Sequence, residues 1–166
     1  PDFFYAAHFD AYENFATAVE NDFITFGRQL LGTILFFVPR TIWPNKPVGS
    51  GHEMAENLGY SFNNISMPFL GEGYINFGAT GVFVFATLIG YLMARIDSRF
   101  VANKNGGTTA DYSSAVYFFL IGALFFLLRG DLLSSFAYIS AGLIVAALIE
   151  KAMKLINSVN FSPLKF

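Results

Sequence analysis

The segment at residues 40–51, RTIWPNKPVGSG, carries the side chains best suited to chemistry on a charged substrate. It combines two cations, Arg40 and Lys46, with Pro and Gly, and it interrupts a sequence of long apolar runs. Arginine binds phosphate and carboxylate oxygens through two parallel hydrogen bonds. Irregular backbone of this kind cannot lie in lipid, because its N–H and C=O groups would go unsatisfied. We therefore expect the segment to face water or to line a cavity.

Proton transfer next to this segment would need a base, and four residues compete for that role: Glu72, His52, Glu53 and Glu56. We favour Glu72, because a carboxylate at the edge of an apolar run is suited to proton abstraction. Its alternative role is a structural hydrogen bond to the Gly-rich backbone around it. His52 is a candidate because histidine often serves as a general base, but it is also compatible with a polar surface position. Glu53 completes a capping box with Ser50, so a purely structural role is an equal alternative for it.

The composition indicates an integral membrane protein. Of the 166 residues, 54% are hydrophobic and only 13% are charged, against about 25% charged in soluble domains. The net charge of −2 argues against a nucleic-acid partner. The chain has no Cys, only two His and no Asp-x-Asp motif, so we expect neither a metal nor a cofactor.

Three apolar runs are long enough to cross the hydrocarbon core, and we predict spans at about 76–95, 112–128 and 132–149. The first lies in an uncharged stretch at 73–94, which as a helix covers roughly 33 Å. Only residues 129–131 separate the second and third, which predicts a tight helical hairpin. The alternative, buried helices of a large soluble protein, fits poorly with three such runs in close succession.

Lys and Arg set the expected orientation. Six cations follow the first and last spans: Arg95, Arg99, Lys104, Lys151, Lys154 and Lys165. We therefore place the loop after the first span and a tail at 150–166 in the cytoplasm. Residues 1–72 and the hairpin tip at Arg129 then lie on the periplasmic side.

The region before the first span is expected to be helical in parts. Seven apolar residues recur at helical spacing and predict an amphipathic helix: Phe9, Tyr12, Phe15, Ala16, Val19, Phe23 and Phe26. The apolar stretch at 29–39 is too short to span and suits a re-entrant helix ended by Pro39. A short helix at about 51–58 follows the capping box. The predicted fold is thus all-α, with three spans, an amphipathic and re-entrant region and a long periplasmic loop.

Three sequence blocks carry a resemblance to a known family. They are PRTIWPNKP at 39–47, with Gly51 completing Arg-x10-Gly; GEGYINFGATG at 71–81; and LLRGDLLSS at 127–135. Arg-x10-Gly alone is a weak signal, but the first two blocks followed by a span are much more specific. Together they resemble the bacterial O-antigen polymerases, the Wzy-type oligosaccharide repeat-unit polymerases. The resemblance covers roughly residues 9–149.

The resemblance implies a metal-independent glycosyltransferase of the multi-span GT-C type in the bacterial inner membrane. Such enzymes move a growing glycan from undecaprenyl diphosphate to a new lipid-linked repeat unit at the periplasmic face. The family has more spans than this chain, so we expect a C-terminal portion of a longer protein, with a second cationic loop upstream. A chain-length regulator protein is an expected partner, besides the lipid-linked oligosaccharide and the bilayer itself.

The resemblance also implies roles for named residues. The leaving diphosphate would be bound by four cations: Arg40, Arg28, Lys46 and Arg129. Glu72 or His52 would take the acceptor proton, and Trp43 and Tyr74 would stack on a sugar ring. The structural alternatives are a lipid-snorkelling Arg40, a local Arg129–Asp131 pair, and an interfacial aromatic belt.

Two further functions fit the same features. An O-antigen ligase would pass the finished glycan to another lipid without changing its length. A polysaccharide flippase or transporter would use the cations to line a conduit, and it would form no glycosidic bond.

Overall fold

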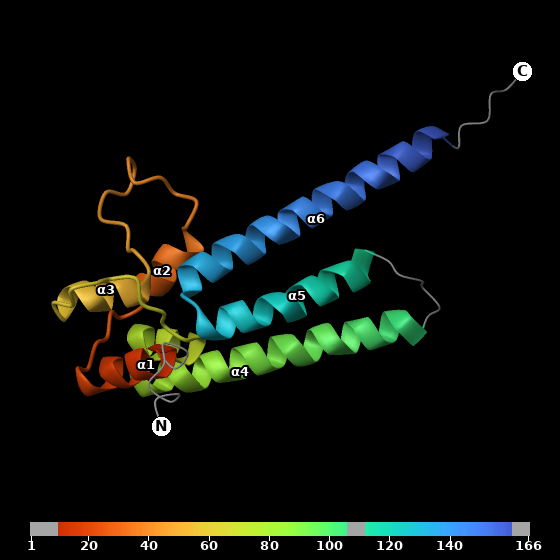
Figure 1. Ribbon diagram of the computed structural model, residues 1–166. Helices are drawn as coiled ribbons and strands as arrows, with labels where there is room; N and C mark the ends of the chain where they lie inside the picture. Colours follow the sequence, from red (N-terminus) through yellow and green to blue (C-terminus); the bar gives the residue numbers. More distant parts are fainter. Residues whose placement is uncertain (1–9, 106–111, 161–166) are drawn as a thin grey trace, which may run out of the picture.

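The computed structural model describes residues 10–105 and 112–160 (Figure 1). This part of the chain folds entirely into helices joined by loops, without any strand. The helices are α1 (Asp10–Glu20), α2 (Arg28–Ile34), α3 (Ser50–Asn57), α4 (Phe69–Asn105), α5 (Tyr112–Arg129) and α6 (Leu132–Asn160). The predicted all-α class is confirmed.

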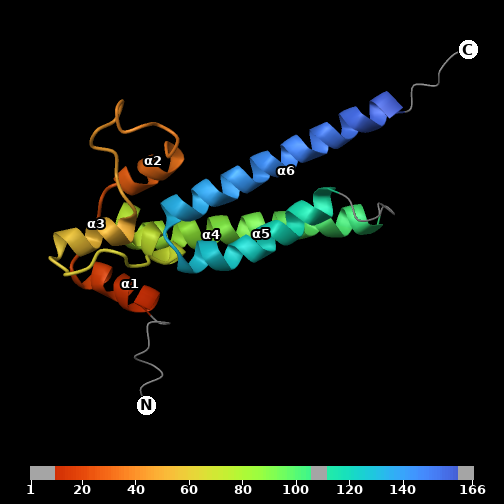
Figure 2. The same cartoon turned by 45° about the horizontal axis from the view of Figure 1, so that its top comes forward.

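The last three helices are each long and apolar enough to cross a membrane, as predicted. α5 contacts both α4 and α6, and α6 diverges from the other two toward its C-terminal end in both views (Figures 1 and 2). Large apolar side chains on all three are exposed, among them Phe83, Phe125 and Leu148. Continuous apolar surface of this kind is rare on a soluble protein, and lipid satisfies it.

The first long helix contains a sharp kink that the sequence did not reveal. The backbone leaves helical geometry at Phe77 and at Gly78, where φ is +65°, a conformation that favours glycine. Two helical turns at 69–76 therefore precede the long apolar part of the helix. The carbonyl groups of Ile75 and Asn76, at the end of the short piece, accept hydrogen bonds from the N–H groups of Thr25 and Gly27, which satisfies them.

Close contact between the two pieces of α4 explains the glycine density of residues 71–81. A Cβ atom added to Gly81 would lie 1.9 Å from the carbonyl oxygen of Gly73, and one added to Gly73 would lie 2.7 Å from that of Gly81. The short piece thus folds back onto the long one with backbone against backbone. This fold-back fixes the position of Glu72.

Helices α4 and α6 run about ten residues beyond the predicted spans, to Asn105 and Asn160. Neither extension contains Pro or Gly, so nothing ends the helix when the apolar run ends. The charged residues that bound the predicted spans lie on continuing helix. The predicted tail at 150–166 accordingly begins as part of α6.

The N-terminal region is less helical than predicted. α1 ends at Glu20 rather than near Phe26, because Asp22, Phe26 and Gly27 adopt positive φ, which a continuous right-handed helix does not allow. Phe9 lies outside the described residues. The predicted re-entrant helix at 29–39 is only α2, after which turns lead to Pro39, whereas α3 lies within one residue of its predicted bounds.

All three short helices gather at one end of α4, α5 and α6, the end that also holds the α5–α6 turn (Figure 1). A buried apolar cluster holds α1 and α3 there: Ala18 of α1, Met54 of α3, Met67, and Tyr74 and Ile75 of the short piece of α4. Leu30 of α2 packs on a second cluster, formed by Phe69, Phe85 and Leu132. This end of the molecule therefore contains the sequence block at 39–47, which includes Arg40, and the block at 71–81, which includes Glu72.

Candidate functional site

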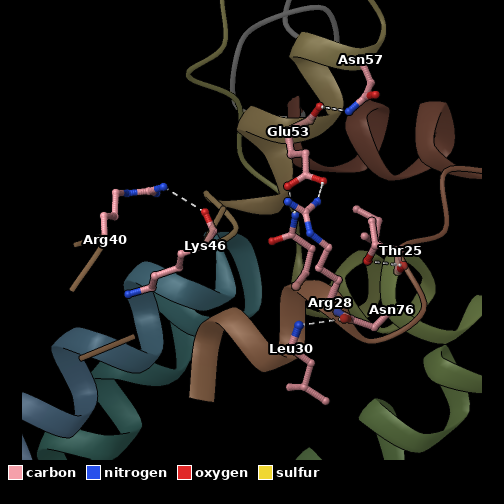
Figure 3. A network of polar contacts seen from close by, with 10 residues as sticks. Thr25, Arg28, Leu30, Arg40, Lys46, Glu53, Asn57 and Asn76 are labelled. Carbon is pink, nitrogen blue, oxygen red and sulfur yellow. Dashed lines mark hydrogen bonds and ion pairs between the residues drawn. The ribbon is translucent and has the colours of Figure 1, made fainter. Parts of the chain in front are cut away.

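Helix α3 lies between two polar clusters, and the first joins it to α2. The guanidinium group of Arg28 forms an ion pair with Glu53 (Figure 3). Gln29 Nε2 donates a 2.6 Å hydrogen bond to the other oxygen of that carboxylate. The Glu53 side chain is only 14% exposed. The charge of Arg28 is therefore offset by a nearly enclosed carboxylate that Gln29 also binds.

The predicted capping box between Ser50 and Glu53 is wrong. α3 begins after Gly49 and has no side-chain cap, because both members of the predicted pair have other partners. Glu53 binds α2, and the Ser50 hydroxyl donates to Glu72. The sequence pattern identified the start of the helix but not the use of the two side chains.

The α2–α3 loop, residues 35–49, is held together by its own two cations. Lys46 Nζ donates to the carbonyl groups of Phe36 and, at 3.1 Å, of Val38. Arg40 Nη1 donates to the carbonyl of Lys46 at 2.9 Å (Figure 3). No carboxylate in the described ranges lies within ion-pair distance of Arg40, whose side chain is exposed.

Exposed apolar side chains occur in this loop and at the end of α2, close in sequence to the two cations. Ile34, Phe37 and Ile42 are 51%, 69% and 75% exposed. A cation flanked by apolar surface matches the chemistry of a lipid with an anionic head group. Trp43, a predicted sugar contact, is half-buried in the same loop.

The second cluster is a buried carboxylate network that joins α4, α3 and α6. Glu72 is only 1% exposed. One of its carboxylate oxygens accepts a 2.6 Å hydrogen bond from Ser50 Oγ. The other oxygen accepts a 3.1 Å hydrogen bond from the N–H of Leu132. The N–H of Ser50 donates to Asp131 Oδ1 at 3.0 Å. Ser50 thus connects two carboxylates, one buried and one at the surface.

Asp131 caps α6. Its second oxygen accepts hydrogen bonds from the N–H and hydroxyl groups of Ser134, at 2.9 and 3.2 Å, the usual geometry of a helix N-cap. The carboxylate is therefore fixed by Ser50 on one side and Ser134 on the other. Arg129 is the last residue of α5 and its side chain is exposed at this end of the bundle.

Asp131 also lines a polar hollow of about 370 Å³. The hollow lies between α3, the α3–α4 loop (residues 58–68) and the start of α6, and its walls are Val48, Gly49, His52, Asn63, Asn64, Ile65, Asp131 and Ser134. His52 Nε2 is 3.2 Å from Glu56 Oε1 and 3.5 Å from Asn63 Nδ2. The structure thus brings His52 to the polar hollow, whereas Glu72 lies behind it.

Two glycines let these segments approach one another. A Cβ on Gly49 would lie 2.6 Å from Asp131 Oδ1, and a Cβ on Gly51 would lie 2.1 Å from the carbonyl oxygen of Ile65. Gly51, which completes Arg-x10-Gly, is therefore required for packing, because α3 lies directly against the backbone of the α3–α4 loop.

Tyr74 lies in the apolar core. It is 9% exposed, meets Phe15 edge to face, and its hydroxyl donates to Asp22 at 3.3 Å. This placement gives the ring a packing role and leaves it enclosed, away from the polar hollow.

The chain matches the model of one protein family, O-antigen polysaccharide polymerase Wzy, over residues 13–156. The chain belongs to this family. No curated protein and no solved structure matches it. The family match runs from α1 into α6, so both polar clusters of this Wzy-family chain lie inside it. The family establishes a part in O-antigen polymerisation, and with it an integral membrane protein that handles lipid-linked oligosaccharide.

Sequence reasoning on this Wzy-family chain did not assign Ser50, Asp131, Ser134 or the two asparagines of the polar hollow to the site. A signal for one pair was present: Asp131-Leu-Leu-Ser134 opening an apolar run is a helix N-cap pattern. The asparagines had no such signal, because only the folded chain brings the α3–α4 loop to the start of α6.

Proposed function

We propose that this chain takes part in glycosyl transfer from undecaprenyl-diphosphate-linked repeat units at the periplasmic face of the inner membrane, with Arg40 binding the diphosphate. The observation that carries this proposal is an exposed guanidinium without a carboxylate partner in the described residues, in a loop that also exposes apolar side chains. Membership of the Wzy family supplies the reaction class.

The four candidate cations differ in how much of their charge and donor capacity is available. Arg40 uses one nitrogen on a backbone carbonyl, and its remaining N–H groups can approach phosphate oxygens in a bidentate manner. Lys46 is committed to two carbonyls, and Arg28 to Glu53. As diphosphate ligands we therefore rank Arg40 first and Lys46 second. Arg28 acts mainly to hold α2 on α3. Arg129, at the α5–α6 turn, is a further diphosphate contact in this proposal.

These cations would stabilise the leaving diphosphate as its negative charge grows, a role that needs no metal. For the acceptor proton, His52 is the accessible candidate, since it lines the polar hollow. Glu72 could act as the base only if Ser50 and Leu132 released its oxygens. Its contacts favour a positioning role, in which it holds Ser50 and, through Ser50, Asp131.

The proposal is tested in a strain that lacks its own polymerase and carries the full-length protein. We expect Arg40→Ala to abolish the ladder of long surface polysaccharide and Arg40→Lys to restore part of it, because lysine supplies charge but no bidentate fork. The control is Arg99→Ala, which removes an exposed arginine near the opposite end of α4. A full ladder from an Arg40→Ala protein expressed at the normal level would overturn the assigned role.

Purified protein separates the three reaction classes. Incubated with lipid-linked repeat units, a polymerase yields lipid-linked dimers detectable by mass spectrometry. A transporter moves the lipid-linked sugar across a vesicle membrane without forming a dimer. A ligase transfers the glycan to the second lipid and leaves its length unchanged.

A further inference from the structure

We propose that the polar hollow between α3, the α3–α4 loop and α6 is a sugar subsite, which takes one hydroxyl-rich ring of the oligosaccharide rather than its diphosphate. The identification of the ligand as a sugar rests on the proposed function. The shape and chemistry of the hollow stand independently of Arg40.

The walls of the hollow offer both donors and acceptors, as sugar hydroxyl groups require. Asn63 and Asn64 supply amide groups, His52 an imidazole and Ser134 a hydroxyl, while Asp131 supplies carboxylate oxygens. The Asn64 side chain makes no hydrogen bond with any described residue and is exposed. A volume of about 370 Å³ lies at the lower end of ordinary ligand sites, which run from about 300 to 1,000 Å³.

Charge argues against a phosphate in this hollow. Its walls contain a carboxylate, Asp131, but neither Lys nor Arg. An anionic ligand would meet a negative field there, whereas a neutral ring would find a strong hydrogen-bond acceptor. The diphosphate at Arg40 and the sugar in the hollow therefore have separate places.

The subsite is rigid before any ligand arrives. Asp131 is held by two residues, Gly49 lies against its carboxylate, and Ser50 is fixed by a buried acceptor. Such preorganisation lowers the entropy lost on binding. The α3–α4 loop also carries Tyr60 and Phe62, with rings 6.0 Å apart. Phe62 is 61% exposed and offers an apolar face beside the asparagines.

The test is binding of free repeat-unit oligosaccharide, cleaved from its carrier so that it has no diphosphate, to the full-length protein in nanodiscs. Saturation-transfer NMR and calorimetry give the Kd. We expect Asn64→Ala and Asp131→Asn each to weaken binding about tenfold, the loss of one or two hydrogen bonds. Asparagine is a good helix cap, so the second variant retains the start of α6. Asn21→Ala, which removes an exposed amide at the end of α1, is the matched control and should bind normally.

Two further measurements separate the subsite from the proposed function. Arg40→Ala should bind the free oligosaccharide normally, and inorganic pyrophosphate should not displace the sugar. The proposal is overturned if the wild-type protein does not bind, if both hollow variants bind as the wild type does, or if pyrophosphate competes. If Arg40→Ala keeps a full ladder while Asn64→Ala still loses sugar binding, the role of Arg40 fails and the subsite stands.

Discussion

The α2–α3 loop and the polar hollow adjoin each other, since Val48 and Gly49 belong to both, yet they are built in opposite ways. The loop is exposed, cationic and stabilised by its own backbone carbonyls. The hollow is anionic and rests on a buried network that ties three helices together. Charge in the loop is available to a ligand, whereas most of the negative charge at the hollow already has partners.

This difference separates function from stability. Removing an exposed side chain with local contacts changes stability little. Removing a buried group leaves its partners without hydrogen bonds and costs the desolvation of each. Substitutions in the loop should therefore affect activity at constant stability, and substitutions behind the hollow should affect both.

Glu72→Ala is expected to have the largest effect. It leaves the Ser50 hydroxyl and the Leu132 N–H unsatisfied in a site that is 1% exposed, at a cost of about 1–3 kcal/mol for each donor. We expect a large fall in the thermal midpoint, measured by fluorescence-detected size exclusion of the detergent-solubilised protein.

Glu72→Gln sharpens the result. It retains one acceptor oxygen and most of the volume, so it should recover part of the lost stability. If the Gln variant is as stable as the wild type but inactive, Glu72 acts directly as the base. If activity follows stability across the two variants, the residue acts by positioning Ser50.

Gly51→Ala should have the next largest effect. The new Cβ would lie 2.1 Å from the carbonyl oxygen of Ile65, so α3 or the α3–α4 loop must move, at about 1–3 kcal/mol. Gly90→Ala is the matched control, because its Cβ meets no atom within 4 Å and alanine favours helix by about 1 kcal/mol. The thermal midpoint should fall for Gly51→Ala and rise for Gly90→Ala. Equal midpoints for the two variants would show that α3 is not tightly packed on the α3–α4 loop.

Much of the fold could be predicted from the sequence because it depends on local properties. Apolar run length determined the three spans, and the start of α3 follows from its own residues. The kink at Gly78 depends on a close approach between Gly73 and Gly81, which no propensity encodes. The continuation of α4 beyond residue 95 was not predicted, because charged residues end an apolar run without ending a helix.

The site divides in the same way. The cations of the α2–α3 loop are conspicuous in the sequence, since they interrupt apolar runs. Their partners are not: Arg28 lies 25 positions from Glu53, and Glu72 lies 60 positions from Leu132. Contacts of this range are created by the fold-back of α4 and by the α5–α6 turn, so the polar hollow could not have been predicted.

The smallest effect expected is the contrast between Arg28 and Arg40. Arg28→Ala leaves Glu53, 14% exposed, with Gln29, and should lower stability by about 1 kcal/mol, since half of the arginine is in water. Arg40→Ala removes one bond to a backbone carbonyl and should not change the melt measurably. Polymer ladders should show the reverse order, with Arg40→Ala the more severe. If both variants lower stability equally, Arg40 has a structural role, as Arg28 does. The α2–α3 loop would then contribute to stability in the same way as the network behind the polar hollow.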